Sequence, residues 1–280
     1  MDMDNVTAVF QFLLIGISNY PQWRDMFFTL VLIIYLNTLL GNRFMIFLIH
    51  FDPNLHTPVY FFLSNLSFLD LCYGTASMPQ ALVVSLALAT AECLLLAAMA
   101  YDRVVAINNP LLCVCLAATS WGTSLVLTAM LILSLRLHFC GANVINHFVC
   151  EILSLIKLVC SDTSFNELMI LITSVFTLLL LFGFVLLSYV RIAMAVKKIH
   201  LAQGRLKAFT TCGSHLTVVT IFYGAVISMY MKPQSNSSPD QDKFISVFYG
   251  ALTPMLNPLI YSLRNKDVKG AIRKVMLKRT

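Results

Sequence analysis

Long apolar runs dominate this sequence and constrain its fold more than any other feature. Of the 280 residues, 59% are hydrophobic and only 11% are charged, whereas about 25% are charged in a typical soluble domain. Seven runs are long enough to cross a bilayer as a helix, which needs about 20 apolar residues. They cover residues 25–49, 58–79, 82–106, 115–136, 166–191, 208–231 and 243–263. The sequence therefore predicts a membrane protein.

The continuity of these runs favours helices over a membrane barrel. Barrel strands alternate apolar and polar residues over about ten positions, and the runs show no such alternation. A helix also satisfies its own backbone groups in lipid. Neither a repeat of fixed period nor a low-complexity segment divides the chain. We predict an all-α protein in which residues 1–280 form a single bundle of seven transmembrane helices.

The basic residues indicate how this bundle is oriented. Cytoplasmic loops are enriched in Lys and Arg, and 13 of the 19 basic residues lie on one side of the predicted spans. We therefore predict that the N-terminus lies outside and the C-terminus in the cytoplasm. The net charge of +6 then reflects this topology and contact with anionic membrane lipid, and we expect no nucleic-acid partner.

Polar side chains within the apolar spans are costly and usually face the bundle interior, and four of them can lie close together. They are Asn42, Asp70, Glu92 and Asn257. In one interpretation they converge on a small hydrated pocket, in which a cation offsets the two carboxylates. In the other they form hydrogen bonds between helices and only contribute to packing.

Arg43 also lies inside a predicted span, where insertion scales assign a charge a cost of about 2.5–3.5 kcal/mol. Two interpretations fit the sequence: the side chain extends to the membrane interface, or it weakens the span. No function follows from the sequence alone.

Two further motifs lie at the ends of spans. Asp102 and Arg103 are adjacent at the inner end of the third span, where they either form ion pairs or anchor the helix end. Pro254 and Pro258 lie within the seventh span. Proline removes a backbone donor and kinks a helix, so this span contains either a hinge or a static kink.

Three cysteines lie between the fourth and fifth spans, on the predicted outer side: Cys140, Cys150 and Cys160. Oxidising conditions permit disulfides there, and the odd number leaves one cysteine over. His147, Cys150 and Glu151 are potential metal ligands but too few for a site. The sequon at Asn5 predicts glycosylation on the same side.

The sequence contains no strong catalytic constellation. We find no nucleophile elbow, zinc-protease motif, phosphate-binding loop or dinucleotide fingerprint. We therefore expect a protein that is not an enzyme.

Six motifs occur in order along almost the whole chain. They are "GN" at 41–42, "LHTPVYFFLSNLSFLDLC" at 55–72, "MAYDRVVAI" at 99–107, "SYVRI" at 188–192, "KAFTTCGSHL" at 207–216 and "PMLNPLIYSLRNKDVKGAIRKV" at 254–275. With these motifs the chain resembles the olfactory receptors of the rhodopsin-like (class A) G-protein-coupled receptors. The resemblance implies activation by a small volatile odorant, coupling to a stimulatory heterotrimeric G protein and adenylate cyclase, and location in the plasma membrane.

The resemblance also assigns roles to residues. Within the outer half of the bundle, helical spacing places candidate ligand contacts on the inward faces, although each could equally be bundle packing: Leu86, Ala89, Thr90, Thr173, Phe176, Thr177, Tyr223, Val226, Ile227, Val247 and Ala251. The candidate switch and G-protein contacts are Asp102, Arg103, Ile107, Tyr189, Arg191, Ala195, Lys198, Lys207, Asn257, Pro258, Tyr261 and Arg264. Asn42, Asp70, Glu92 and Asn257 match the family's polar interior, where a sodium ion is expected.

The chain departs from the family pattern in two places. After "SMPQALVV" about 20 residues, or one membrane span, are missing between the second and third helices. The lost part would carry the cysteine that pairs with the outer loop, so Cys150 is expected to be an orphan while Cys140 and Cys160 can bridge each other. After Pro110-Leu111-Leu112 about nine further residues are missing, although the remaining connection is within the common range.

These departures leave a second functional hypothesis open. A native disulfide contributes about 2–5 kcal/mol, so the shortened chain could be a damaged receptor that is retained in the endoplasmic reticulum and does not signal. An unrelated transporter or channel is disfavoured because no inverted repeat and no pair of broken helices occurs.

Overall fold

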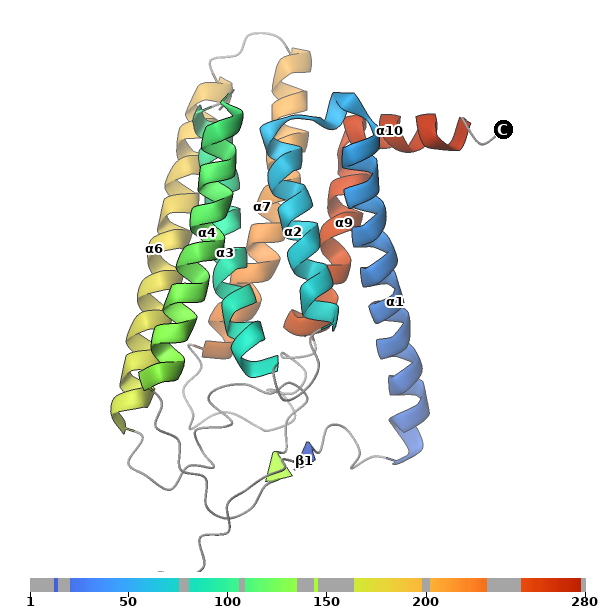
Figure 1. The fold of residues 1–280 in the computed structure, drawn as a ribbon. Helices are drawn as coiled ribbons and strands as arrows, with labels where there is room; N and C mark the ends of the chain where they lie inside the picture. The colour runs from blue at the N-terminus through green and yellow to red at the C-terminus, as the bar shows by residue number, and fades with distance from the viewer. Residues whose placement is uncertain are drawn as a thin grey trace, which may run out of the picture.

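Among the described residues, seven α-helices run side by side along one axis, and an eighth, α10, lies across one end of the bundle (Figure 1). This computed structural model describes residues 13–14, 21–75, 81–105, 109–134, 144–145, 164–197, 202–230 and 248–277. Within these residues the α-helices are α1 (Pro21–Phe51), α2 (Pro58–Thr75), α3 (Ala81–Val105), α4 (Pro110–Ser134), α6 (Ser164–Lys197), α7 (Ala202–Tyr230), α9 (Thr253–Arg264) and α10 (Lys266–Leu277).

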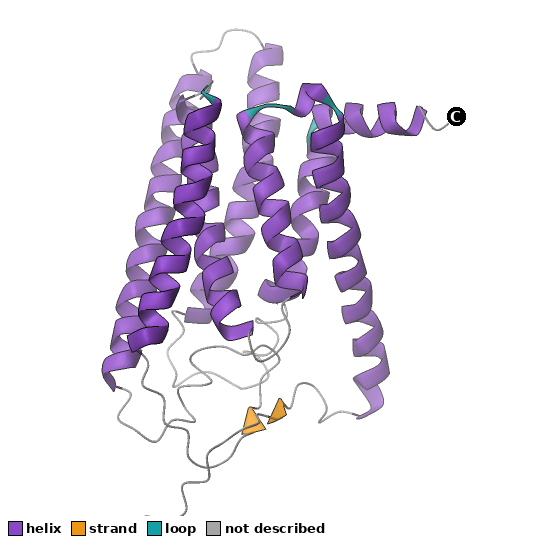
Figure 2. Ribbon diagram, in the orientation of Figure 1, coloured by secondary structure: helices purple, strands orange, loops and turns teal. Residues whose placement is uncertain are grey.

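Short elements complete the described part of the chain. The 3-10 helix η1 (Pro53–Leu55) follows α1, and the π-helix η3 (Phe248–Leu252) leads directly into α9. Strands β1 (Leu13–Leu14) and β2 (Val144–Ile145) pair in parallel beyond the end of the bundle opposite α10 (Figure 2). We call the two ends of the bundle the α10 end and the opposite end.

Each predicted span overlaps a helix, and the all-α bundle confirms the predicted fold class. The largest differences are at α6 and α7, which meet at the α10 end and continue six residues beyond their predicted limits of 191 and 208. These extensions contain basic residues such as Lys197 and Arg205. The hydropathy pattern stops at the bilayer, whereas the helical hydrogen-bond pattern continues into the aqueous phase.

Three peripheral helices have the length and composition of membrane spans: Phe28–Phe51 in α1, Pro110–Met130 in α4 and Thr177–Lys197 in α6. Many of their apolar side chains are exposed, with Leu40 and Leu187 both 68% accessible. Apolar patches of this extent are not stable in water. In a bilayer they face lipid tails, which are as apolar as leucine.

Helix α3 forms the centre of the bundle. It packs against α2, α4 and α6, and Leu95, Leu96 and Ala100 are fully buried. A helix that is apolar on all sides is stable only when it is surrounded. Helix α2 ends at Thr75 and α3 begins at Ala81, so both helices form although the sequence between the two predicted spans is short. Residues 76–80 lie outside the described part.

Helices α1 and α9 approach closely where proline interrupts the hydrogen bonds of α9. Pro258 has no N–H, so the carbonyl four residues earlier, at Pro254, loses its helical partner. The Asn42 side chain of α1 donates to that carbonyl at 3.0 Å. Gly41 permits this approach, because a Cβ added there would lie 3.1 Å from Cγ of Pro258.

We therefore expect Gly41→Leu to force α1 away from α9 and lower the free energy of unfolding by about 1–3 kcal/mol. The measurement is thermal unfolding of the purified protein in detergent. Gly122→Leu is the matched control, because a Cβ added at Gly122 of α4 meets nothing within 4 Å. Equal shifts in Tm for both variants would contradict the proposed contact.

Candidate functional site

Two buried polar clusters lie along the axis of the bundle, and the first joins α2, α3 and α9. The amide Nδ2 of Asn257 donates to Oδ2 of Asp70 at 3.0 Å and to Oδ1 at 3.3 Å. The Glu92 carboxylate lies close enough to Asp70 and Asn257 to interact with both electrostatically. Asp70 is fully buried, and Asn257 and Glu92 are each 2% exposed. We call these three residues the interior carboxylate cluster.

The interior carboxylate cluster has two acidic groups and unused acceptor capacity. Oε1 of Glu92 is buried and has no hydrogen-bond partner among the described residues. Oγ1 of Thr253, about one turn before Asn257 on α9, is also buried and has no partner among these residues. Two carboxylates that share one site repel each other unless a proton or a cation lies nearby. The cluster therefore has the composition of a site for a hard cation, which prefers oxygen ligands.

Three of the four polar residues that the sequence singled out lie together, and the fourth has a different partner. The structure brings Asp70, Glu92 and Asn257 together, whereas the Asn42 amide is used for the Pro254 carbonyl. Thr253 was missed by the sequence reasoning. A hydroxyl next to a proline in an apolar run is the only signal that pointed to it.

The second cluster lies nearer the α10 end and joins α3, α6 and α7. The hydroxyl of Tyr189 forms a short hydrogen bond with Nδ1 of the fully buried His215, and the two rings stack with centroids 5.8 Å apart. Arg103 lies within hydrogen-bonding reach of the Cys212 thiol. We call Arg103, Tyr189, Cys212 and His215 the arginine cluster.

Arg103 is only partly satisfied within this cluster. Its Nε is buried and has no hydrogen-bond partner among the described residues, and neither has the hydroxyl of Tyr261. The neighbouring Asp102 is also buried at the end of α3. His215 was missed by the sequence reasoning, although a histidine in the middle of an apolar run was a signal for it.

The other predicted switch residues lie at or near the same end. Arg191 and Ala195 are exposed on α6, while Pro258 and Tyr261 are buried in α9. Lys207 and Arg264 belong to α7 and α9, but their side chains lie outside the described part of the structure, as do Ile107 and Lys198 entirely.

The candidate ligand contacts are only partly described. Tyr223 and Val226 are buried in α7, and five further candidates are half-buried: Ala89, Thr90, Thr177, Ile227 and Ala251. Tyr223 packs against Phe182 of α6, with ring centroids 5.1 Å apart, and its buried hydroxyl has no partner among the described residues. The side chains of Leu86, Thr173 and Phe176 lie outside the description, and so does Val247.

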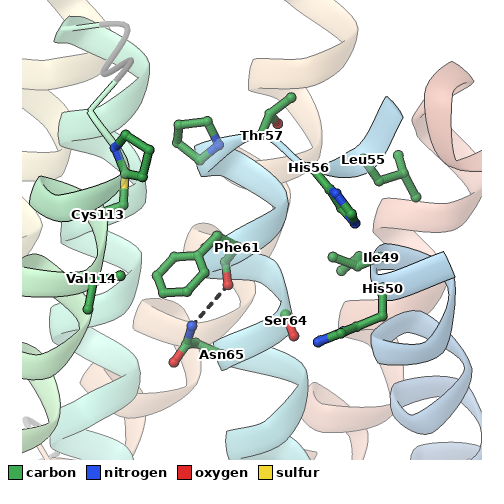
Figure 3. A pocket seen from close by; sticks show the side chains of 12 residues that line it. Ile49, His50, Leu55, His56, Thr57, Phe61, Ser64, Asn65, Cys113 and Val114 are labelled. Carbon is green, nitrogen blue, oxygen red and sulfur yellow. Dashed lines mark hydrogen bonds between the residues drawn. The ribbon is translucent and has the colours of Figure 1, made fainter. Parts of the chain in front are cut away.

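Two cavities formed by described residues lie elsewhere. One, of about 450 Å³, lies between α3, α4 and α6. The other, of about 610 Å³, lies at the α10 end between α1, α2 and α4, where His50, Phe61 and Val114 surround it (Figure 3). None of the candidate ligand residues lines either cavity. The larger cavity includes Pro110, at the point where the chain is shortened.

The residues predicted to lie on the outer side fall outside the described part of the chain. Asn5, Cys140, Cys150 and Cys160 lie outside the described residues, as do His147 and Glu151. Within the described residues, no group of three or more His, Cys, Asp and Glu side chains could hold a metal ion.

Helix α10 is fixed to the bundle by an apolar face and two polar contacts. Val268 and Ala271 are buried, as expected for one face of an amphipathic helix. Nζ of Lys274 lies 3.0 Å from Oδ2 of Asp52, the residue that caps η1. The hydroxyl of Tyr60 on α2 donates to Oδ2 of Asp267 at 3.3 Å.

The fold itself places the chain among known structures. The crystal structure of squid rhodopsin aligns with a TM-score of 0.67 at 16% identity, covering 88% of this chain and 78% of that one. The protein therefore has the rhodopsin-like seven-helix fold.

Sequence comparisons identify the family. The family described as Olfactory receptor matches residues 31–93 and 86–279. Human Olfactory receptor 13H1 is 82% identical, with 100% of both chains covered. Mouse Olfactory receptor 1E16 is 46% identical, covering 98% of this chain and 97% of that one. The chain belongs to the olfactory receptor family of multi-pass membrane proteins, whose members are receptors and not enzymes.

The comparison also bears on the two departures from the family pattern. The alignment with human Olfactory receptor 13H1 has 308 positions, against 280 residues here, so about 28 positions have no counterpart in this chain. This number agrees with the two missing segments predicted from the motifs. The two family matches overlap at residues 86–93, close to the predicted first gap.

The docking of α10 generates a pH-dependent prediction. The hydrogen bond from Lys274 holds the pKa of Asp52 below its usual value of 3.8. A depressed carboxylate pKa contributes stability above the usual value, and the contribution is lost as pH falls through the folded-state pKa. We expect the protection of the α10 amides against hydrogen exchange, measured relative to their intrinsic rates at each pH, to fall below about pH 4, and to be low at neutral pH in Asp52→Asn.

The matched control is Asp25→Asn, which neutralises an exposed carboxylate at the other end of α1. Unchanged protection of the α10 amides in Asp52→Asn would show that the contact between Lys274 and Asp52 does not hold this helix.

Proposed function

We propose that this chain is an odorant-activated receptor that couples to a stimulatory heterotrimeric G protein and through it to adenylate cyclase. Membership of the olfactory receptor family supports this function. The observation that carries it is the arginine cluster, because a partly unsatisfied arginine lies where three helices converge near the α10 end.

A small, mostly apolar odorant binds in the half of the bundle opposite α10. Ligand sites of this kind are apolar with a few oriented polar groups. The Tyr223 hydroxyl can supply one such group, since it is buried and has no partner among the described residues. An odorant that binds the active arrangement more tightly than the inactive one shifts the population toward the active arrangement.

The arginine cluster converts this shift into a signal. The Tyr189–His215 hydrogen bond joins α6 to α7, so movement of α7 away from the bundle axis breaks it. Arg103 then becomes accessible, and its guanidinium can donate to carbonyl or carboxylate groups of the G protein. Further G-protein contacts are expected from Ile107, Arg191, Ala195, Lys198, Lys207 and Arg264.

We propose a sodium ion as the cation of the interior carboxylate cluster. The two carboxylates and the unused oxygens of Glu92 and Thr253 support this assignment. Asp70 and Glu92 would supply most of the negative charge, and Asn257 an amide oxygen. A cation held between α2, α3 and α9 stabilises the arrangement in which these helices are close together.

The proposed location is the plasma membrane, with the α10 end in the cytoplasm, Asn5 glycosylated and Cys140 bridged to Cys160. The roughly 28 absent positions favour one competing outcome, a chain that is retained in the secretory pathway and does not signal. Export to the cell surface separates these two proposals.

Surface display tests the function directly. The natural chain, tagged at its N-terminus, is expected to stain on intact cells and to raise cyclic AMP when a matching odorant is added. The reference is a chain in which the missing segment between α2 and α3 is restored from human Olfactory receptor 13H1. Arg103→Ala should reach the surface but remain silent. Staining of the restored chain alone would establish retention and refute the proposal.

Thermal unfolding tests the sodium site. Replacing choline chloride with sodium chloride should raise Tm of the purified protein, by an amount that corresponds to about 1.4 kcal/mol when sodium is ten times its Kd. Asp70→Asn should abolish the sodium effect, and Asp25→Asn should preserve it. An equal sodium effect in the wild type and in Asp70→Asn would exclude the proposed site.

A further inference from the structure

The lipid-facing side of α1 carries a charged residue, Arg43. Helix α1 packs on α2 and α9 through a stripe that includes Thr38, Asn42 and Met45, all buried. Arg43 lies on the other side of the helix and is exposed, together with Leu40 and Phe47. Figure 1 shows α1 at the edge of the bundle.

The depth of Arg43 places it in the hydrocarbon region. The apolar span of α1 covers Phe28–Phe51, and the polar residues His50 and Asp52 mark its end toward α10. Arg43 precedes His50 by seven residues, which corresponds to about 10 Å along a helix. The opposite end of the span is about twice as far away.

The side chain is too short to reach the nearer interface. A helical Cα–Cβ bond tilts toward the N-terminus of the helix, and in α1 that direction leads away from His50. An extended arginine side chain has a reach of about 7 Å at bond lengths of about 1.5 Å. The guanidinium therefore remains among lipid tails, where its five donors need an acceptor.

The described part of this chain supplies no such acceptor. Arg43 has no hydrogen bond or ion pair among the described residues. Among the side chains that the structure describes, the acidic groups in the middle of the apolar helices are Asp70 and Glu92, and both are buried inside the bundle. A second copy of the chain could therefore not offer either carboxylate to Arg43 without unfolding.

We propose that Arg43 pairs with an aspartate or glutamate on the lipid-facing side of a transmembrane helix of a different protein. The charges are complementary, and each would be costly in lipid without the other. Leu40, Phe44 and Phe47 surround Arg43 with exposed apolar surface that can pack against such a helix. A lipid phosphate is the poorer partner, because it would have to be drawn about 10 Å into the membrane. This side of α1 is thus an interface for a heterologous membrane partner.

Energy transfer in vesicles tests this interface. The full-length protein, with a donor dye on its C-terminal tail, is reconstituted in zwitterionic phosphatidylcholine vesicles. The probe is an acceptor-labelled polyleucine helix with one central glutamate, and the matched probe carries glutamine instead. We expect the glutamate helix to bind the wild-type protein about tenfold more tightly than the glutamine helix. The preference should disappear in Arg43→Leu, which removes only an exposed charge.

A charge exchange keeps the test independent of folding. Arg43→Glu should lose the preference for the glutamate helix and acquire one for a lysine helix. The proposal is overturned if Arg43→Leu retains the glutamate preference. It is also overturned if, in matched vesicles that contain phosphatidylserine, this lipid gathers around the wild-type chain while the glutamate helix is not captured, or if copies of the chain associate with each other through Arg43.

Discussion

A bilayer offers no water to an unpaired carbonyl, and this constraint governs the contact on which the rest of the bundle depends. Pro258 leaves the carbonyl of Pro254 without a helical donor, and Asn42 of α1 supplies the missing hydrogen bond. The distance is possible only because Gly41 has no side chain against Pro258. Glycine, asparagine and proline each destabilise an isolated helix, but here each compensates for another. Together they fix the rotation of α9 and direct Asn257 and Tyr261 into the interior.

Helix α9 connects the two polar clusters. Asn257 contacts Asp70 of α2, and Tyr261 lies about one turn further toward α10. Both side chains are buried, and the Tyr261 hydroxyl is unsatisfied among the described residues. A cation at the first cluster and a G protein at the second can thus bias the position of the same helix. Two sites that favour different positions of one element are coupled reciprocally in their affinities.

The sequence predicted the features that depend on neighbouring residues along the chain. The helices could be found because about 20 consecutive apolar residues have few other solutions, and Asp70, Glu92 and Asn257 could be singled out because each is costly in such a run. The partners were not predictable. His215 pairs with Tyr189 across α6 and α7, and Lys274 reaches Asp52 from the far end of the chain. These contacts depend on helix rotation and on where loops bring the ends together, which hydropathy does not encode. Asn42 was grouped with the carboxylates because its requirement to satisfy Pro254 is visible only in three dimensions.

The π-helix η3 has a consequence for how α9 relates to the segment before it. A π-turn accommodates one residue more than an α-helical turn, so Phe248, at the start of η3, is rotated relative to the place it would take in a continuous α-helix. Ala251 lies within this wide turn. If a single residue were removed from Phe248–Leu252, the π-turn could tighten to a regular α-helical turn. Asn257, Pro258 and Tyr261 would keep their positions. The candidate ligand-facing positions before them would turn by about 100°, which is the rotation of one residue in a 3.6-residue turn. One helix could in this way vary its ligand face during evolution without altering its signalling face.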